Sequence, residues 1–278
     1  MKAYIQLIRP LNCVMVAIAV FIGALITKGL EVVEVHYSSI GLACIAAFLF
    51  TGAGNSLNDY FDRDIDKINH PFRPIPSRRI TPENAVMVAF VLFLASFILA
   101  IFINLMVFVI VIANLAVMLS YEIFFKVKGV AGNLTISWLT ATTFLFGGAA
   151  VMAIEKTSVL AILAFLATLG REIAKDIEDI KGDKGRYTLP MKHGLKNAGI
   201  MASSAITVGV LISPIPMISG VFSGEGSMYY LPVIMLADAI FIYCIFLLLK
   251  GKNLVSIPIK GAMLIALLAF LAGGILPV

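Results

Sequence analysis

Charged residues are scarce in this chain. Asp, Glu, Lys and Arg make up 13% of its 278 residues, whereas a soluble domain carries about 25%. This deficit excludes a water-exposed globular surface of ordinary composition. Hydrophobic residues make up 60% of the chain, compared with about 45–50% in soluble domains. The surplus of apolar side chains has to face something other than water, and it indicates a lipid bilayer.

Residues that bind transition metals are also few. The three cysteines, Cys13, Cys44 and Cys244, lie inside apolar stretches without a C-x-x-C spacing, which is typical of small packing residues. The three histidines are scattered along the chain and form no H-x-x-x-H pair. A zinc site is therefore not expected.

Apolar stretches of about 20 residues recur along the whole chain, and each is long enough to cross roughly 30 Å of hydrocarbon. They predict an all-α protein with nine transmembrane helices, forming one membrane domain over residues 1–278. The third and fourth stretches are continuous enough to form a hairpin that turns near Asn104. The predicted spans are 11–28, 38–58, 83–101, 103–121, 132–153, 157–175, 198–222, 229–249 and 258–276.

The positions of Lys and Arg predict the orientation, because basic residues favour the cytoplasmic side. With the N-terminus inside, nine spans put 19 of the 21 basic residues on that side and leave only Lys28 and Lys156 outside. A wrong number of spans would distribute the basic residues over both sides of the membrane. We therefore expect a multi-pass protein of the cell membrane with a cytoplasmic N-terminus. Topology and contact with anionic lipids explain this charge without any further function.

Two aspartate clusters lie at the inner ends of the second and sixth predicted spans. The first reads N-D-Y-F-D-R-D-I-D from Asn58 to Asp66, and the second reads K-D-I-E-D-I-K-G-D from Lys175 to Asp183. Corresponding aspartates are 117 residues apart in every case: Asp59 and Asp176, Asp62 and Asp179, Asp66 and Asp183. The constant offset suggests an internal parallel repeat, with both halves presenting carboxylates to the same side of the membrane.

The spacing of the clusters predicts a metal site. Positions i, i+3 and i+7 fall within about 60° of one another on a helix, so each trio forms a stripe if the helix continues that far. Six carboxylates so close together would repel one another unless cations lay among them. Mg²⁺ prefers oxygen ligands, uses one or two carboxylates and bridges to substrate phosphates. A single Asp-rich turn would be read as ordinary solvated charge, but two matched turns predict Mg²⁺ ions holding a diphosphate.

The same residues resemble the signatures of the UbiA superfamily of intramembrane prenyltransferases. The pattern N-D-x-x-D-x-x-x-D beginning at Asn58 is similar to its first signature, and K-D-x-x-D-x-x-G-D beginning at Lys175 to its second. The segment R-P-I-P-S-R-R-I beginning at Arg73 is similar to the one that follows the first signature, but Arg78 stands where glycine is common. The resemblance covers essentially the entire chain. It implies helices around a central cavity, capped by the signature loops on the cytoplasmic side.

Within the superfamily, G-R-E-I-A-K-D-I-E-D from Gly170, T-L-P from Thr188 and R-P-x-N from Arg9 most resemble the archaeal digeranylgeranylglyceryl phosphate synthases. This resemblance implies Mg²⁺-dependent transfer of a geranylgeranyl group from geranylgeranyl diphosphate to geranylgeranylglyceryl phosphate. The expected partners are therefore a polyprenyl diphosphate, a lipid-soluble acceptor and membrane lipids, and no nucleic acid. The oligomeric state is not readable from the sequence.

Chemistry and resemblance together assign roles to individual residues. The predicted metal ligands are Asn58, Asp59, Asp62, Asp66, Asp176, Asp179 and Asp183, with Asp59 either a ligand or a group that orients one. The predicted catalytic carboxylates are Asp62, Asp66, Asp179 and Asp183. The candidate diphosphate contacts are Arg63, Lys67, Lys126, Lys175 and Tyr121. The candidate acceptor contacts are Arg9, Asn12, Arg73 and Arg78, although topology alone accounts for the arginines equally well.

Other functions remain open at this stage. An aromatic prenyltransferase of the same superfamily, acting on 4-hydroxybenzoate or a quinone precursor, has the same signatures. A CDP-alcohol phosphotransferase is also a metal-dependent membrane enzyme, but its pattern needs one aspartate run and not two. A transporter is expected to carry charges near the middle of its spans, where Asp238 is the main example here.

Overall fold

In the computed structural model, the described residues are 1–126, 129–180, 188–222, 224–252 and 254–275. Over these residues the chain is helical and contains no strand, so the predicted all-α class is confirmed. The elements are α1 (Lys2–Ile8), α2 (Pro10–Leu25), α3 (Glu31–Phe61), α4 (Arg63–Asn69), α5 (Pro82–Ile101), α6 (Leu105–Ser120), η1 (Tyr121–Phe125), α7 (Val130–Ala150), η2 (Ile154–Thr157), α8 (Ser158–Asp179), α9 (Leu189–His193), α10 (Leu195–Ile212), α11 (Ile215–Ile218), α12 (Gly224–Leu249) and α13 (Ser256–Ile275).

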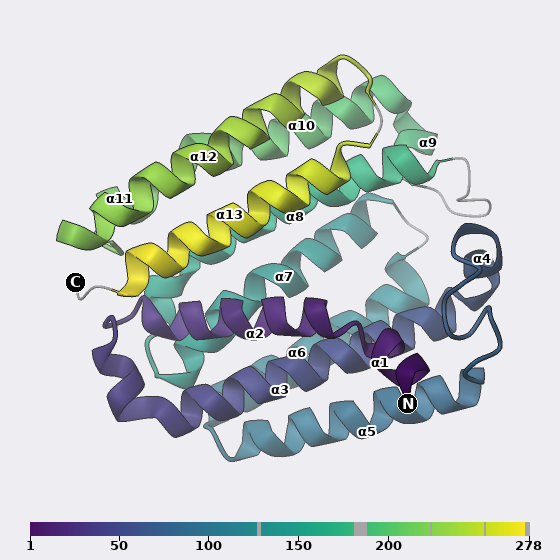
Figure 1. Ribbon diagram of the computed structural model, residues 1–278, viewed down its shortest axis with the longest axis horizontal. Coiled ribbons are helices and arrows are strands. Elements are labelled where there is room, and N and C mark those ends of the chain that lie inside the picture. Colours follow the sequence, from purple (N-terminus) through teal and green to yellow (C-terminus); the bar gives the residue numbers. More distant parts are fainter. Residues whose placement is uncertain (127–128, 181–187, 223, 253, 276–278) are drawn as a thin grey trace.

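The long helices lie side by side in a bundle (Figure 1). Helices α2, α3, α5 and α6 occupy the lower part of the view, and α8, α10, α12 and α13 the upper part. Helix α7 lies between them and packs against both α2 and α8. The short helices α4 and α9, which follow α3 and α8, lie at the same end of the bundle. The two aspartate clusters therefore share one end, as the sequence predicts.

The predicted multi-pass architecture is confirmed. Within the described part of the chain, seven helices are long and apolar enough to cross a membrane, or eight if α1 and α2, which meet at 44°, form one bent span. Helix α7 is not among them. Its sequence includes Asn133 and four threonines, which lower its hydropathy, and 11 of its 21 residues are buried inside the bundle. The predicted count of nine spans and the predicted orientation stay predictions.

Local sequence explains the turn between α5 and α6. Helix α5 ends at Ile101 and α6 begins at Leu105. The side chain of Asn104 caps α6 by accepting a hydrogen bond from the Val107 backbone N–H at 2.9 Å. The same side chain donates to the carbonyl of Ala149 at 2.9 Å, which fastens the turn to the end of α7. The predicted hairpin near Asn104 is therefore confirmed.

Helices α2 and α7 cross at two glycines. A Cβ atom added to Gly147 would lie 2.0 Å from the carbonyl oxygen of Val20, and one added to Gly23 would lie 2.3 Å from that of Phe144. Both obstacles are backbone atoms, which cannot rotate away. Small residues allow such close contact between membrane helices, so these glycines set the distance between α2 and α7.

Candidate active site

The first aspartate cluster lies at a break between helices. Helix α3 ends at Phe61 and α4 begins at Arg63, so Asp62 is the junction. The helix is therefore not continuous from Asp59 through Asp62 to Asp66, which was the condition for these three residues to form one stripe. The three carboxylates are nevertheless buried, with exposed fractions of 1% for Asp59, 9% for Asp62 and 3% for Asp66. Burying charge is costly unless it is paired, so their partners matter.

Two arginines pair with this cluster. Arg9 forms an ion pair with Asp59. Arg73 lies between two carboxylates, with its Nη1 2.6 Å from Asp66 Oδ2 and 3.5 Å from Asp59 Oδ1. Arg9 adopts a left-handed backbone conformation, φ 53°, between α1 and α2. Two of the four predicted acceptor contacts, Arg9 and Arg73, therefore lie against the cluster, and they surround Asp59 in a way that suits an orienting role.

A short π-helix, η1, and Lys126 directly after it present further charges to the first cluster. Lys126 Nζ lies 2.9 Å from Asp62 Oδ2 and 2.7 Å from Glu122 Oε2. Asn58 Nδ2 donates to Glu122 Oε1 at 2.9 Å, and Lys126 Nζ lies 5.6 Å from the centre of the Tyr121 ring. Single π-turns often occur at functional sites. Glu122 had no predicted role, although a lone acid at the inner end of an apolar span is a usable signal.

The second cluster ends α8. Asp176 Oδ2 accepts a hydrogen bond from Asn133 Nδ2 at 2.9 Å, which ties α8 to α7. Asp179 is the last residue of α8 and is exposed. Its predicted companion Asp183 lies outside the described residues.

His70 lies near charged residues of both clusters. Its pKa is lowered from the ordinary histidine value by partial burial and by the charges of Arg73 and Lys175. The carboxylates of Asp66 and Asp179 act on the same imidazole in the opposite direction. One side chain thus interacts electrostatically with both clusters, and the structure brings together the two groups that the sequence separates by 117 residues.

Two predicted diphosphate contacts are engaged elsewhere. The guanidinium of Arg63 lies over the Tyr60 ring, 4.6 Å from its centre, and donates to the Tyr60 carbonyl. Lys67 binds Asp64 at 2.7 Å and thereby lowers the pKa of that carboxyl. The Arg63–Tyr60 contact is partly buried and the Lys67–Asp64 pair is exposed. The roles of Arg63 and Lys67 at the site stay predictions.

A cavity of about 380 Å³ opens beside the clusters. Polar side chains line one part of it and come from α2, α3, α5, α6, η1, α7, α8 and the turn between α1 and α2. Apolar side chains of α2, α3, α6 and α7 line the rest. Its polar lining residues include Arg9, Asn12, Asn55, Asn58, Tyr121, Arg171, Glu172 and Lys175. Four of the predicted contacts, Arg9, Asn12, Lys175 and Tyr121, therefore line one cavity. Arg171 and Glu172 had no predicted role.

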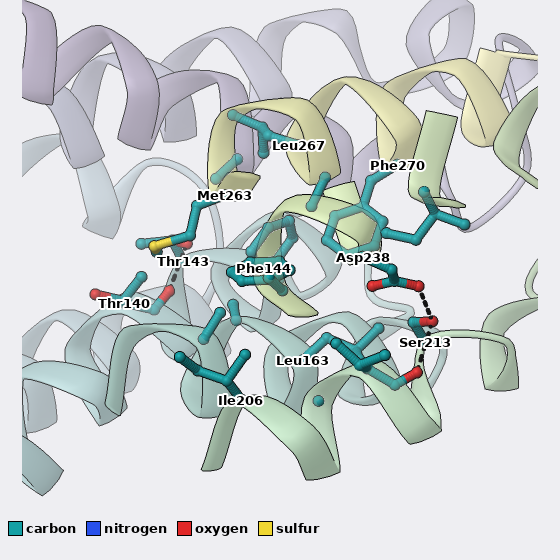
Figure 2. A pocket seen from close by; sticks show the side chains of 18 of the residues that line it. Thr140, Thr143, Phe144, Leu163, Ile206, Ser213, Asp238, Met263, Leu267 and Phe270 are labelled. Carbon is teal, nitrogen blue, oxygen red and sulfur yellow. Dashed lines mark hydrogen bonds between the residues drawn. The ribbon is translucent and has the colours of Figure 1, made fainter. Parts of the chain in front are cut away.

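A second, largely apolar cavity of about 150 Å³ lies on the other side of α2 and α7. Figure 2 shows Phe144, Leu163, Met263, Leu267 and Phe270 around it. At one end, Ser213 Oγ donates to Asp238 Oδ2 at 2.7 Å, which supplies a partner for this intramembrane carboxyl. Three residues line both cavities: Val16, Thr140 and Thr143. The protein therefore has two adjoining chambers with a common wall.

The larger cavity ends beside the two aspartate clusters, and we call this end the mouth. The oxygen atoms that the clusters supply there are chemically suited to Mg²⁺. Among the described residues, no three His, Cys, Asp or Glu side chains are grouped closely enough to hold a metal by themselves. Mg²⁺ commonly needs only one or two carboxylates, since substrate phosphates and water complete its shell. Asp62, Asp66, Asp176 and Asp179 supply such oxygens, and Asn58 uses its amide nitrogen on Glu122, which leaves its amide oxygen for a cation.

Comparison with known proteins identifies the family. A sequence profile of the UbiA prenyltransferase family matches residues 16–274. The chain belongs to the UbiA prenyltransferase family. A digeranylgeranylglyceryl phosphate synthase of Methanothermobacter thermautotrophicus is 38% identical to it over 98% of this chain and 96% of the relative. One from Methanococcoides burtonii is 39% identical over 98% of this chain and 100% of the relative.

Solved structures agree with this UbiA assignment. One described as concerning digeranylgeranylglyceryl phosphate synthase in membranes superposes with a TM-score of 0.79 at 36% identity, covering 99% of this chain and 98% of the other. A UbiA homolog from Archaeoglobus fulgidus bound to GPP and Mg²⁺ superposes with a TM-score of 0.70 at 18% identity, over 98% and 99% of the two chains. The second likeness concerns the fold alone. The predicted superfamily is confirmed.

The UbiA resemblance also explains an unusual arginine. Arg78, which stands where related segments commonly have glycine, has φ 58°, a left-handed conformation that favours glycine. Its backbone N–H donates to the Ile75 carbonyl at 2.9 Å, which closes the turn before α5. The glycine preference at this position therefore follows from backbone geometry.

Arg78→Gly is expected to stabilise the protein by about 1 kcal/mol, because it removes left-handed strain that costs more than the extra freedom of glycine in the unfolded chain. The melting temperature of purified protein in lipid nanodiscs measures the effect. Arg79→Gly is the matched control, since Arg79 has no left-handed strain and donates to the Phe72 carbonyl; it is expected to lower the melting temperature. A lower value for Arg78→Gly would contradict the explanation.

Proposed function

We propose that the protein transfers a geranylgeranyl group from geranylgeranyl diphosphate to geranylgeranylglyceryl phosphate in a Mg²⁺-dependent reaction. The observation that carries this proposal is a mouth rich in carboxylates and cations at one end of the larger chamber, with a second, largely apolar chamber across a common wall. A reaction that unites two prenyl chains on one glycerol needs an anion site and room for both chains. The names of the relatives, which align along almost the whole chain, support the same substrates.

The two aspartate clusters are the proposed binding site for the diphosphate of the donor. Asn58, Asp62 and Asp66 would hold one Mg²⁺, and Asp176, Asp179 and Asp183 the other. Bound there, the ions neutralise the charge that develops on the diphosphate. The A. fulgidus UbiA homolog bound to GPP and Mg²⁺ supports this arrangement. Lys126 and Lys175 stand beside the clusters and add positive charge for the diphosphate oxygens.

The reaction exchanges one C–O bond for another. The bond between C1 of the prenyl group and the diphosphate oxygen breaks, and the electron pair leaves with the diphosphate. The free hydroxyl oxygen of the acceptor bonds to C1, and its proton passes to the departing diphosphate. The apolar walls, among them Phe144 and Phe146, keep water away from the allylic cation, which water would otherwise convert to an alcohol.

We also propose nine spans with a cytoplasmic N-terminus and active site, in one domain built from two repeats. The common end of the clusters and the 19 basic residues on one predicted side support this topology.

A product assay tests the function. Purified protein in vesicles receives geranylgeranyl diphosphate, Mg²⁺ and, in parallel reactions, geranylgeranylglyceryl phosphate or 4-hydroxybenzoate, and mass spectrometry identifies the products. We expect a glyceryl phosphate carrying two geranylgeranyl ethers, formed only with Mg²⁺. Prenylation of the aromatic acid alone would instead assign the protein to the aromatic branch of the family.

A further inference from the structure

We propose that Arg171 binds the phosphate of the lipid acceptor and so selects a phosphorylated acceptor over a neutral alcohol. This inference rests on the proposed function and names the residue that recognises the acceptor. Arg171 lies within α8, in a stretch apolar enough to cross the membrane, and lines the larger chamber. A charge at such a position is costly and generally has a functional partner.

The hydrogen bonding of Arg171 is incomplete. Among the described residues its guanidinium has one partner, Glu172, which accepts from Nη1. Its Nε is buried and has no hydrogen-bond partner in the described part of the chain. A buried donor without a partner is unfavourable and calls for an explanation such as an absent anion. The edge formed by Nε and Nη2 is the fork that binds two phosphate oxygens at once.

The surroundings of Arg171 favour an anion. The same chamber is lined by Arg9 and Lys175, and Glu172 is the one carboxylate among the described residues of its wall. Arg9 is held by Asp59 in the first cluster. Lys175 precedes Asp176 and stands beside the second cluster. Unlike Arg9, Arg171 forms no ion pair with either aspartate cluster among the described residues.

The distance of Arg171 from the mouth indicates that it binds the acceptor and not the donor. Arg171 lies five residues before Asp176 on the same helix, which places it about 7.5 Å farther from the mouth along the axis. The donor diphosphate belongs at the mouth, so C1 of its prenyl group extends toward Arg171. On a three-carbon glycerol the reacting hydroxyl and the phosphate are at most two carbon–carbon bonds apart. The acceptor phosphate must therefore lie close to C1, on the chamber side of the diphosphate.

Acceptor discrimination tests the proposal. The protein is assayed with geranylgeranylglyceryl phosphate and with the same lipid lacking its phosphate, at saturating donor. Arg171→Gln is expected to raise KM for the phosphorylated acceptor about 100-fold, the size expected for a charge-assisted phosphate contact. Arg171→Lys, which keeps the charge and loses the fork, is expected to raise it about tenfold. KM for the donor and kcat/KM for the unphosphorylated acceptor should stay within about twofold of wild type, since neither involves this contact.

Lys196→Gln is the matched control, because Lys196 is an exposed cation on α10 away from both chambers; it should leave both acceptors unchanged. Equal losses with the two acceptors, or a raised KM for the donor, would overturn the proposal. Binding of radiolabelled geranylgeranylglyceryl phosphate in EDTA gives a readout without turnover. If wild-type protein forms no ether product, the proposed function fails, and this binding measurement alone decides the role of Arg171: tight binding that weakens in Arg171→Gln supports it, and equal or absent binding overturns it.

Discussion

Asp62→Ala and Asp179→Ala are each expected to lower kcat of Mg²⁺-dependent prenyl transfer by about 10³-fold, because each removes an oxygen ligand from an ion that stabilises the leaving diphosphate. The two residues represent one cluster each, so comparable losses are expected although the first is 9% exposed and paired with Lys126 and the second is exposed. Steady-state turnover at several Mg²⁺ concentrations measures the effect. A higher Mg²⁺ requirement in either variant would identify metal binding as the property lost.

Asp64→Ala separates ligation from the general charge of the cluster. Asp64 lies in the same motif, but it is exposed and pairs with the likewise exposed Lys67. Its removal changes the net charge by the same amount as removal of Asp62 and is expected to leave kcat within about twofold of wild type, as for other exposed ion pairs. Full turnover by Asp62→Ala or Asp179→Ala would refute the metal assignment. A loss in Asp64→Ala as large as theirs would show that charge alone matters.

Gly147→Ala is expected to destabilise the folded bundle by about 3 kcal/mol, at the upper end of the usual cost of overpacking. The new Cβ would lie 2.0 Å from the Val20 carbonyl oxygen and 2.8 Å from the Ala24 backbone nitrogen, so α2 has to move as a whole. Because α2 and α7 also form the common wall of the two chambers, prenyl transfer should fall with stability. The melting temperature and the yield of monodisperse protein measure the first effect.

Gly41→Ala and Gly261→Ala are matched controls within α3 and α13. A Cβ atom at either position meets nothing within 4 Å. Alanine is the better helix former, so both variants are expected to be as stable as wild type or slightly more stable. If Gly147→Ala melted at the same temperature as these controls, close packing of α2 on α7 would not limit the stability of the protein.

The features that could be predicted are those that depend on patterns along the sequence. Apolar runs located the long helices, Asn104 located a turn, and the constant offset between the aspartate clusters predicted their meeting at one end. The break at Asp62 was not foreseen, because neither glycine nor proline marks it. Ion pairs such as Arg9 with Asp59, which are 50 residues apart in the chain, depend on tertiary packing. The second chamber was invisible for the same reason: six helices contribute to its wall, and no single one carries a recognisable pattern.

The glycine contact between α2 and α7 has a consequence for how the protein is made. Gly23 and Gly147 are 124 residues apart, and at about 5–20 residues per second their synthesis is separated by roughly 6–25 s. During this interval α2 is already in the bilayer without the helix against which its glycine face packs. The first four long helices are therefore in the membrane before the rest of the bundle has been made. The wall between the chambers forms only when α7 is inserted. A chain arrested before that point has no closed chamber, so a nascent protein cannot hold a prenyl chain shielded from its surroundings.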